Sequence, residues 1–251
     1  MSTPRSLLRR VSNRLPRFRV PTSGRRCIFK FVTSSAEIRI ISFKHQWFYR
    51  YRLHCTRSRC SPDPLHAFLE SLFEHCPNHI FEASAFRCSR CKLPLGTLPS
   101  HTTDHEIITL ARTSLGYTNF KSAHENLQKY FLDHDTGTLA AEVPLWMEQG
   151  DVPGYEQHFA TAESLTGHID ILRFNPVRES GAIEVWDYKP GARKERFAAT
   201  QVFLYAYMLS VRTGIPIGRF SCGYFDEEDA YTFEPAGVGM PDFGGWSGKR
   251  G

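Results

Sequence analysis

The chain has 251 residues, of which 41% are hydrophobic, and its formal net charge at pH 7 is +5. This length suits one domain of ordinary size with appendages, and the apolar content is enough to bury a core. No stretch approaches the ~18 consecutive apolar residues of a membrane-spanning helix, and no apolar signal-peptide run follows the start, so we expect an intracellular protein, cytoplasmic or nucleoid-associated, with no membrane partner.

Positive charge is concentrated at the start of the chain. Residues 1–59 hold 15 of the 31 Lys and Arg but only one acid, Glu37. A basic arm beside an acidic body indicates either an extension that binds a polyanion or a targeting peptide, and an untidy start to the chain would look the same. We therefore expect residues 1–26 to form a disordered basic arm, with mitochondrial targeting left open.

Residues 27–53 are rich in β-branched and aromatic side chains and partly alternate in polarity, which predicts a hairpin or short strands. The run H-Q-W-F-Y-R-Y-R at residues 45–52 interleaves aromatic rings with basic groups. Such side chains can stack on bases and pair with phosphates. A half-buried strand with a solvated basic face explains the same pattern and is the interpretation we favour.

A helix of about three turns is predicted from Asp63, the expected N-cap, with Pro64 at its first position. Residues 76–100 lack periodicity and are expected to form a loop or knuckle. Two further helices are predicted at 104–115 and 119–132.

The second half of the chain alternates between strands and helices. Strands are predicted at 138–146, 165–174, 182–189 and 217–225, with a helix at 195–212 between the last two. Gly214 is the expected C-cap of that helix. This order predicts an α/β core with a mixed central sheet flanked by helices over residues 101–235, followed by a disordered Gly-rich tail at 236–251.

The cysteine cluster predicts a small metal site. This site, the hairpin and the short helix are expected to form one region, residues 27–100. A C-x-x-H pair and a C-x-x-C pair offer four ligands suited to tetrahedral structural Zn²⁺. These candidate ligands are Cys76, His79, Cys88 and Cys91. Cys55 and Cys60 are a rival pair for the same ion, so the ligand set stays open.

Two acids and a lysine form the most informative pattern. Asp170 lies in L-T-G-H-I-D-I-L-R-F, and A-I-E-V-W-D-Y-K-P begins twelve residues later. Side chains alternate along a strand, so Asp187 and Lys189 point the same way whereas Glu184 points the other way, and we assign Asp187 as the acid that partners the lysine. If the two strands are neighbours, Asp170 can approach Asp187 to within about 5 Å.

Two carboxylates so close repel each other unless a cation neutralises them. Mg²⁺ does this well because it prefers oxygen ligands and keeps several waters. Lys189 would then stabilise a developing hydroxide beside the ion, and cleavage of a phosphodiester is the natural chemistry. The plainer alternative is an exposed ion pair between Asp187 and Lys189 that contributes little.

These motifs resemble the PD-(D/E)XK nuclease superfamily, in particular its RecB-like and CRISPR-associated exonuclease-like branch, over roughly residues 120–225. Its marks here are G-H-I-D, W-D-Y-K-P-G and Q-V-F-L-Y-A-Y, the last of which contains Gln201 and Tyr205. The resemblance implies a restriction-endonuclease-like core and an enzyme that uses Mg²⁺ or Mn²⁺ to cut single- or double-stranded DNA. Replication, repair and mobile-element proteins are all open as further partners.

The resemblance also nominates residues around the metal. Gln201 and Tyr205, four apart on one helix face, become candidates for positioning the substrate, although Tyr205 fits simple packing equally well. His124, on the helix predicted at 119–132, is a candidate because family members often carry a histidine on the first core helix. Glu142 is a candidate on its own pattern, because it lies on the strand predicted at 138–146 and alternates with the apolar Leu139, Ala141, Val143 and Leu145. The carbonyl of Tyr188 is a further possible ligand.

A catalytically silent, zinc-containing nucleic-acid-binding protein is the alternative to a nuclease. The basic arm and the cysteine cluster would suffice for it. The two acids and the lysine argue against this reading, because a protein that only binds has no use for two carboxylates near a phosphate.

Overall fold

The computed structural model describes residues 37–241. The predicted basic arm at residues 1–26 lies outside the described residues, as do the first ten residues of the predicted hairpin segment and the tail beyond residue 241. No helix of the described part is long and apolar enough to cross a membrane.

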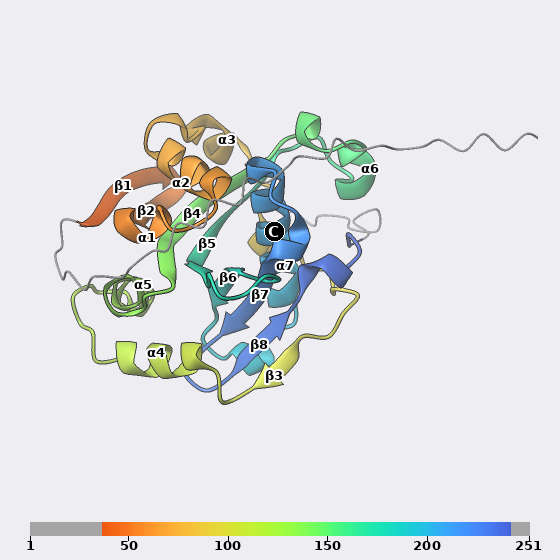
Figure 1. Cartoon of the computed structure of the whole chain (residues 1–251). Coiled ribbons are helices and arrows are strands. Elements are labelled where there is room, and N and C mark those ends of the chain that lie inside the picture. The colour runs from red at the N-terminus through yellow and green to blue at the C-terminus, as the bar shows by residue number, and fades with distance from the viewer. Residues whose placement is uncertain (1–36, 242–251) are drawn as a thin grey trace, which may run out of the picture. The chain divides into compact units, whose positions relative to one another are not determined.

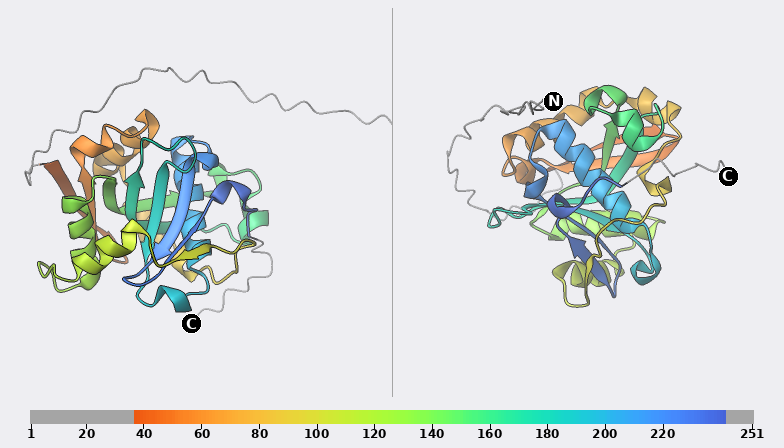
Figure 2. Two further views of the ribbon diagram at one scale, coloured as in Figure 1. Left: turned by 60° about the horizontal axis from the view of Figure 1, so that its bottom comes forward. Right: turned by 90° about the vertical axis from the view of Figure 1, so that its right-hand side faces the viewer.

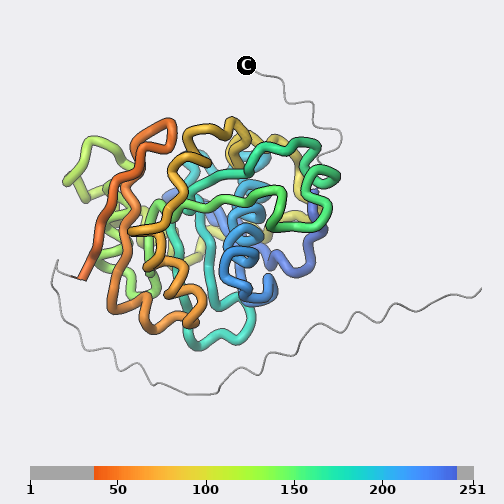
Figure 3. The backbone as a smooth tube through the Cα atoms, turned by 90° about the horizontal axis from the view of Figure 1, so that it is seen from above, coloured from red at the N-terminus to blue at the C-terminus, as the bar shows by residue number. Residues whose placement is uncertain are grey.

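The described residues form one mixed sheet of eight strands in the order β1-β2-β4-β5-β6-β7-β8-β3. Neighbouring strands are antiparallel except β6 and β7, which are parallel. The strands are β1 (Ile38–His45), β2 (Trp47–His54), β3 (Ser100–Thr102), β4 (Thr138–Met147), β5 (Leu165–Phe174), β6 (Ile183–Tyr188), β7 (Phe220–Phe225) and β8 (Ala230–Phe233). The β1–β2 hairpin lies at one edge of the sheet, and β7 and β8 lie toward the other, as Figure 3 shows.

Helices cover both faces of this sheet (Figures 1 and 2). The helices are α1 (Cys55–Ser58), α2 (Asp63–His75), α3 (Asn78–Ala83), α4 (Glu106–Ser114), α5 (Ala123–His134), α6 (Tyr155–Phe159) and α7 (Ala198–Thr213). Helix α7 packs on one face in a core that includes Val185 and Val202. Helices α4 and α5 pack on the opposite face in a second core that includes Ile171 and Trp186.

Strand β6 is buried on both of its faces. Val185 belongs to the core beneath α7 and Trp186 to the core beneath α4 and α5, as the period of two along a strand requires. The parallel neighbour β7 can be reached only by a crossover, which α7 supplies. That helix ends at Gly214, the predicted C-cap, which adopts φ 68° and donates its N–H to the carbonyl of Ser210.

The predicted α/β class with a mixed sheet and flanking helices is confirmed, with several local corrections. Asp63 is the first residue of α2 rather than its N-cap, which is Pro62 and makes no side-chain capping bond. The segment 76–100 contains helix α3, not only loop. Strands β3 and β8 were not predicted, because three and four residues are too few to display a periodicity.

Candidate active site

Asp170 lies where the pairing between β5 and β6 ends. The last paired residues are Ile171 and Trp186, so one more step in register would bring Asp170 opposite Asp187. Instead, Oδ2 of Asp170 accepts a hydrogen bond of 2.8 Å from the backbone N–H of Tyr188. The carboxylate therefore lies between the two strands at the end of their ladder, and its second oxygen, Oδ1, contacts the neighbouring helix.

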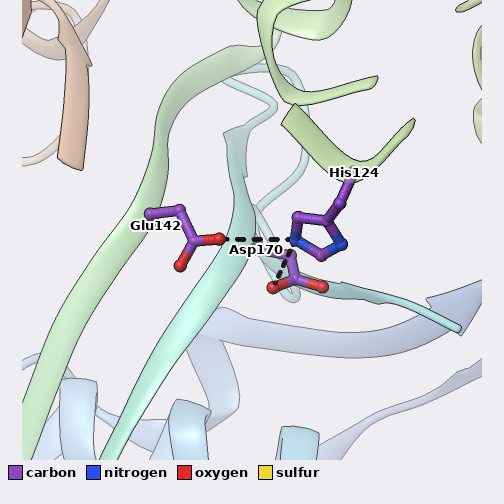
Figure 4. Close-up of side chains that lie close together, drawn as sticks. All are labelled: His124, Glu142 and Asp170. Atoms are coloured by element: carbon purple, nitrogen blue, oxygen red, sulfur yellow. Dashed lines mark ion pairs between the residues drawn. The ribbon is translucent and has the colours of Figure 1, made fainter. Parts of the chain in front are cut away.

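Three elements bring metal-ligating groups together around that second oxygen (Figure 4). Nε2 of His124, from α5, lies 3.2 Å from Oδ1 of Asp170 and 3.4 Å from Oε1 of Glu142, from β4. One ligand atom from each of these residues lies within 4.8 Å of the others. His124 and Glu142 were proposed from the sequence as site residues, and the structure places both beside Asp170.

Glu142 has an unusual backbone for a strand residue. Its φ is 53°, in the left-handed region that residues other than glycine rarely adopt. Ala141 belongs to the core beneath α4 and α5 whereas Val143 belongs to the core beneath α7, although a regular strand would put both on one face. The predicted regular alternation of β4 is therefore wrong at this residue. Such a conformation costs roughly 1–3 kcal/mol and clusters at functional sites.

Gln128 holds the Glu142 carboxylate in place and was missed by the sequence analysis. Its Nε2 donates a hydrogen bond of 2.7 Å to Oε1 of Glu142, and its own Oε1 accepts one of 3.2 Å from the buried Arg52. His124 and Gln128 are four residues apart, so they share one face of α5. That spacing was the available signal, although a buried glutamine on a helix is not by itself a mark of a site.

The side chains of Asp187, in β6, and of Lys189, just after it, lie together, as the alternation predicted. Nζ of Lys189 lies 2.5 Å from Oδ2 of Asp187, which is almost wholly buried with 1% of its surface exposed. The other oxygen, Oδ1, accepts a hydrogen bond of 3.3 Å from Nε2 of Gln201. Gln201 also donates a hydrogen bond of 2.7 Å to the hydroxyl of Tyr205, four residues later on α7. Tyr205 therefore acts on the Asp187 carboxylate through Gln201.

The glycine of G-H-I-D is explained by Tyr205. A Cβ atom at Gly167 would lie 2.3 Å from Cε1 of the Tyr205 ring and 3.3 Å from Sγ of Cys88. No residue larger than glycine fits there without displacing that ring. The packing role of Tyr205 is therefore visible, because its ring fills the core against Gly167, and its hydroxyl accepts a hydrogen bond from the Gln201 amide; a role in positioning the substrate stays a prediction.

Burial and neighbouring charges together shift the pKa values of the site. Burial, and then repulsion from the Asp170 carboxylate, raises the pKa of Asp187 to about 8, despite the nearby Lys189 ammonium. Burial works against the charged forms of Asp170, His124 and Lys189, but it is outweighed. His124 lowers the pKa of Asp170, the carboxylates of Asp170 and Glu142 hold the pKa of His124 well above its usual range, and Asp187 and Asp170 raise the pKa of Lys189.

These residues fit a hard divalent cation. Carboxylates and one imidazole are ligands that Mg²⁺ and Mn²⁺ accept. Oδ2 of Asp187 is buried and accepts no hydrogen bond of ordinary geometry, although the charged Lys189 lies beside it. A divalent ion would neutralise the neighbouring carboxylates of Asp187 and Asp170.

The structure does not bring the four predicted zinc ligands together. Within the described residues, the one group of three or more potential ligands is that of His124, Glu142 and Asp170. Cys88 and Cys91 are buried in the core beneath α7, where burial raises the pKa of both thiols. Cys76 packs against the edge of the same core, where its Sγ lies 3.9 Å from Nε2 of His45. Burial in the core thus accounts for Cys88 and Cys91, and the zinc site stays a prediction.

Comparison with known proteins assigns the family. The model of the PD-(D/E)XK nuclease superfamily matches residues 44–243, which is most of the chain and includes every residue of the cluster described above. Neither the comparison with curated proteins nor that with solved structures gave a match. The match is to the superfamily as a whole and does not single out a branch. With the sheet, the acidic cluster and the lysine in place, the chain belongs to the PD-(D/E)XK nuclease superfamily.

Proposed function

We propose that this protein is a metal-dependent nuclease that hydrolyses DNA phosphodiester bonds and uses Mg²⁺ or Mn²⁺. The observation that carries the proposal is the Lys189 ammonium 2.5 Å from the buried Asp187 carboxylate, with Asp170 close enough to raise the pKa of that carboxylate. Family membership supports a metal-dependent nuclease in general. The choice of DNA, and of a RecB-like relationship, rests on the resemblance of the three motifs.

Asp170 and Asp187 would hold the ion, with Glu142, His124 and the carbonyl of Tyr188 as further candidate ligands. When bound, a divalent ion supplies charge that polarises the phosphoryl oxygen and acidifies a bound water. The strained backbone at Glu142 is consistent with this role, because strain of that kind persists where surrounding structure demands one particular side-chain position.

Lys189 would act on the attacking water. Its ammonium, charged at neutral pH, stabilises the negative charge that develops as that water loses its proton. Gln201 orients Asp187 through the hydrogen bond to Oδ1, and Tyr205 holds the Gln201 amide. The Asp187 carboxylate, which must be placed to within a fraction of an ångström, is thus supported by the buried side chains of Gln201 and Tyr205.

The test is cleavage of linear and circular DNA, single- and double-stranded, by the wild type and by Lys189→Ala in Mg²⁺, Mn²⁺ or EDTA. Lys129→Ala is the matched control, because Lys129 also pairs with an aspartate but lies on α5. We expect cutting that requires metal, is lowered at least 100-fold in Lys189→Ala and is unchanged in Lys129→Ala. If no variant cuts any substrate although all are folded and bind DNA equally, the protein is a silent nucleic-acid-binding member of its family.

A further inference from the structure

The β1–β2 hairpin has one face on which aromatic and basic side chains gather. Across the hairpin, Lys44 pairs with Phe48 and Ser42 pairs with Arg50, and side chains at paired positions point to the same face. Phe48 is 81% exposed, which is unusual for a phenylalanine in a strand. A solvated basic face explains the charges, but it does not explain the exposed ring among them.

This face continues into the candidate active site. A pocket with a volume of ≈ 480 Å³ is lined by Phe48, Arg50 and Arg52 on one side and by His124 and Glu142 on the other. Such a volume is that of a site for a small molecule or a nucleotide unit. A ligand that touches the hairpin face therefore also reaches the acidic cluster.

The charge on the hairpin side of the pocket suits a phosphate. Nη1 of Arg50 and Nη2 of Arg52 share a single carboxylate oxygen, Oε1 of Glu125, at 3.1 and 3.3 Å. The second carboxylate of the lining, Glu142, lies on the opposite side, so the positive charge is concentrated on the hairpin face, which also carries Lys44. Arg50 is exposed, and guanidinium groups are preferred partners of phosphate oxygens in proteins.

We propose that this hairpin face binds single-stranded DNA and leads the strand to the acidic cluster, an inference that rests on the proposed nuclease function. A base stacks on Phe48, and an adjacent phosphate pairs with Arg50. Stacking requires an open base face, which an unpaired strand offers and a duplex hides between its own base pairs. The combination of exposed ring and basic groups thus selects single strands, whereas basic groups alone would bind both forms.

Binding is measured directly, by fluorescence anisotropy of labelled oligo(dT) and of a duplex of equal length, in EDTA so that no cleavage intervenes. Phe48→Ala removes the ring, and Arg50→Gln removes the charge. Trp47→Ala is the matched control, because Trp47 is also highly exposed, at 72%, but alternates to the other face of the same strand. All three side chains are exposed, so the variants are expected to fold.

Phe48→Ala should weaken binding of oligo(dT) by roughly tenfold, within the range for loss of one stacked base, and leave the duplex nearly unaffected. Arg50→Gln should reduce the slope of log affinity against log salt by about 0.7, the value for one phosphate contact on a single strand. Trp47→Ala should bind both forms as the wild type does.

Equal weakening of single-stranded and duplex binding in Phe48→Ala, or none, would overturn the inference even if the enzyme cuts DNA. Tighter binding of oligo(U) than of oligo(dT) would overturn the assignment to DNA. Selective loss of oligo(dT) binding in Phe48→Ala, combined with no cleavage by the wild type in any metal, would uphold this surface while refuting the proposed nuclease. The two proposals therefore fail separately.

Discussion

A single methyl group at Gly167 tests how the site is packed. A Cβ atom there would lie 2.3 Å from Cε1 and 3.1 Å from Cδ1 of the Tyr205 ring. That ring is buried, and its hydroxyl accepts a hydrogen bond from Gln201, so it cannot swing away without losing a contact. We expect Gly167→Ala to displace the ring and, through Gln201, to loosen Asp187.

Two effects of opposite sign decide the change in stability. Alanine in place of glycine within a strand ordinarily stabilises by ~0.5–1 kcal/mol, because glycine loses more backbone freedom on folding. Overpacking a filled core destabilises by ~1–3 kcal/mol. A contact of 2.3 Å belongs at the severe end of overpacking, so we expect a net loss of ~1–2 kcal/mol, equivalent to a fall of roughly 2–8 °C in melting temperature.

Urea unfolding of a double-mutant cycle checks this reasoning. The four proteins are the wild type, Gly167→Ala, Tyr205→Leu and the double variant. If the ring causes the clash, alanine at position 167 should cost at least ~1 kcal/mol less in the Tyr205→Leu background than in the wild type. An equal cost in both backgrounds, or no cost in the wild type, would refute the packing described here.

Two further predictions concern protons. The pKa of Asp187 in the folded protein is raised to about 8 from 3.8, so the metal-free protein should lose stability as the pH rises between these values. Asp187→Asn should remove this loss of stability, which urea midpoints in EDTA from pH 4 to pH 8 would measure. Parallel curves of midpoint against pH for the two proteins would contradict the prediction. Burial lowers the pKa of His45 from 6.5. The neutral imidazole therefore stabilises the fold at pH values above 6.5, and this stabilisation is lost as the pH falls below 6.5. Between pH 7 and pH 5 the wild type should therefore lose stability more steeply than His45→Gln does. Urea midpoints at each pH measure this difference. An identical fall in the midpoints of both proteins would exclude His45 as a cause.

How well the sequence predicted the site depended on the regularity of each strand. Strand β6 is regular and covered on both faces, so alternation placed Asp187 and Lys189 together correctly. Strand β4 changes face at Glu142, and nothing in the sequence marks this, because the residue that adopts the left-handed backbone is not a glycine. The contact of Glu142 with His124 was therefore beyond any periodicity argument.

For the cysteines, the sequence contained a clear pattern, but the pattern did not reveal where the side chains lie. Their spacing satisfied the rule for a zinc knuckle, but spacing along the chain does not reveal which way side chains point. Cys88 lies in a short 3-10 turn that directs it into the core beside Gly167, a contact across 79 positions of sequence that only the tertiary structure could disclose. The hydrogen bond from Gln128 to Glu142 was missed for the same reason, since it joins a helix to a strand.

At Glu142, the residue that would be best for stability differs from the residue that the proposed activity requires. Glycine, and to a lesser degree asparagine, adopts a positive φ at lower cost than glutamate, so either substitution would relax the strand. Neither carries a carboxylate. A directed-evolution screen that rewarded thermal tolerance alone would accordingly favour Glu142→Gly and discard a proposed ligand of the metal, whereas a screen for cleavage would retain glutamate and its strain.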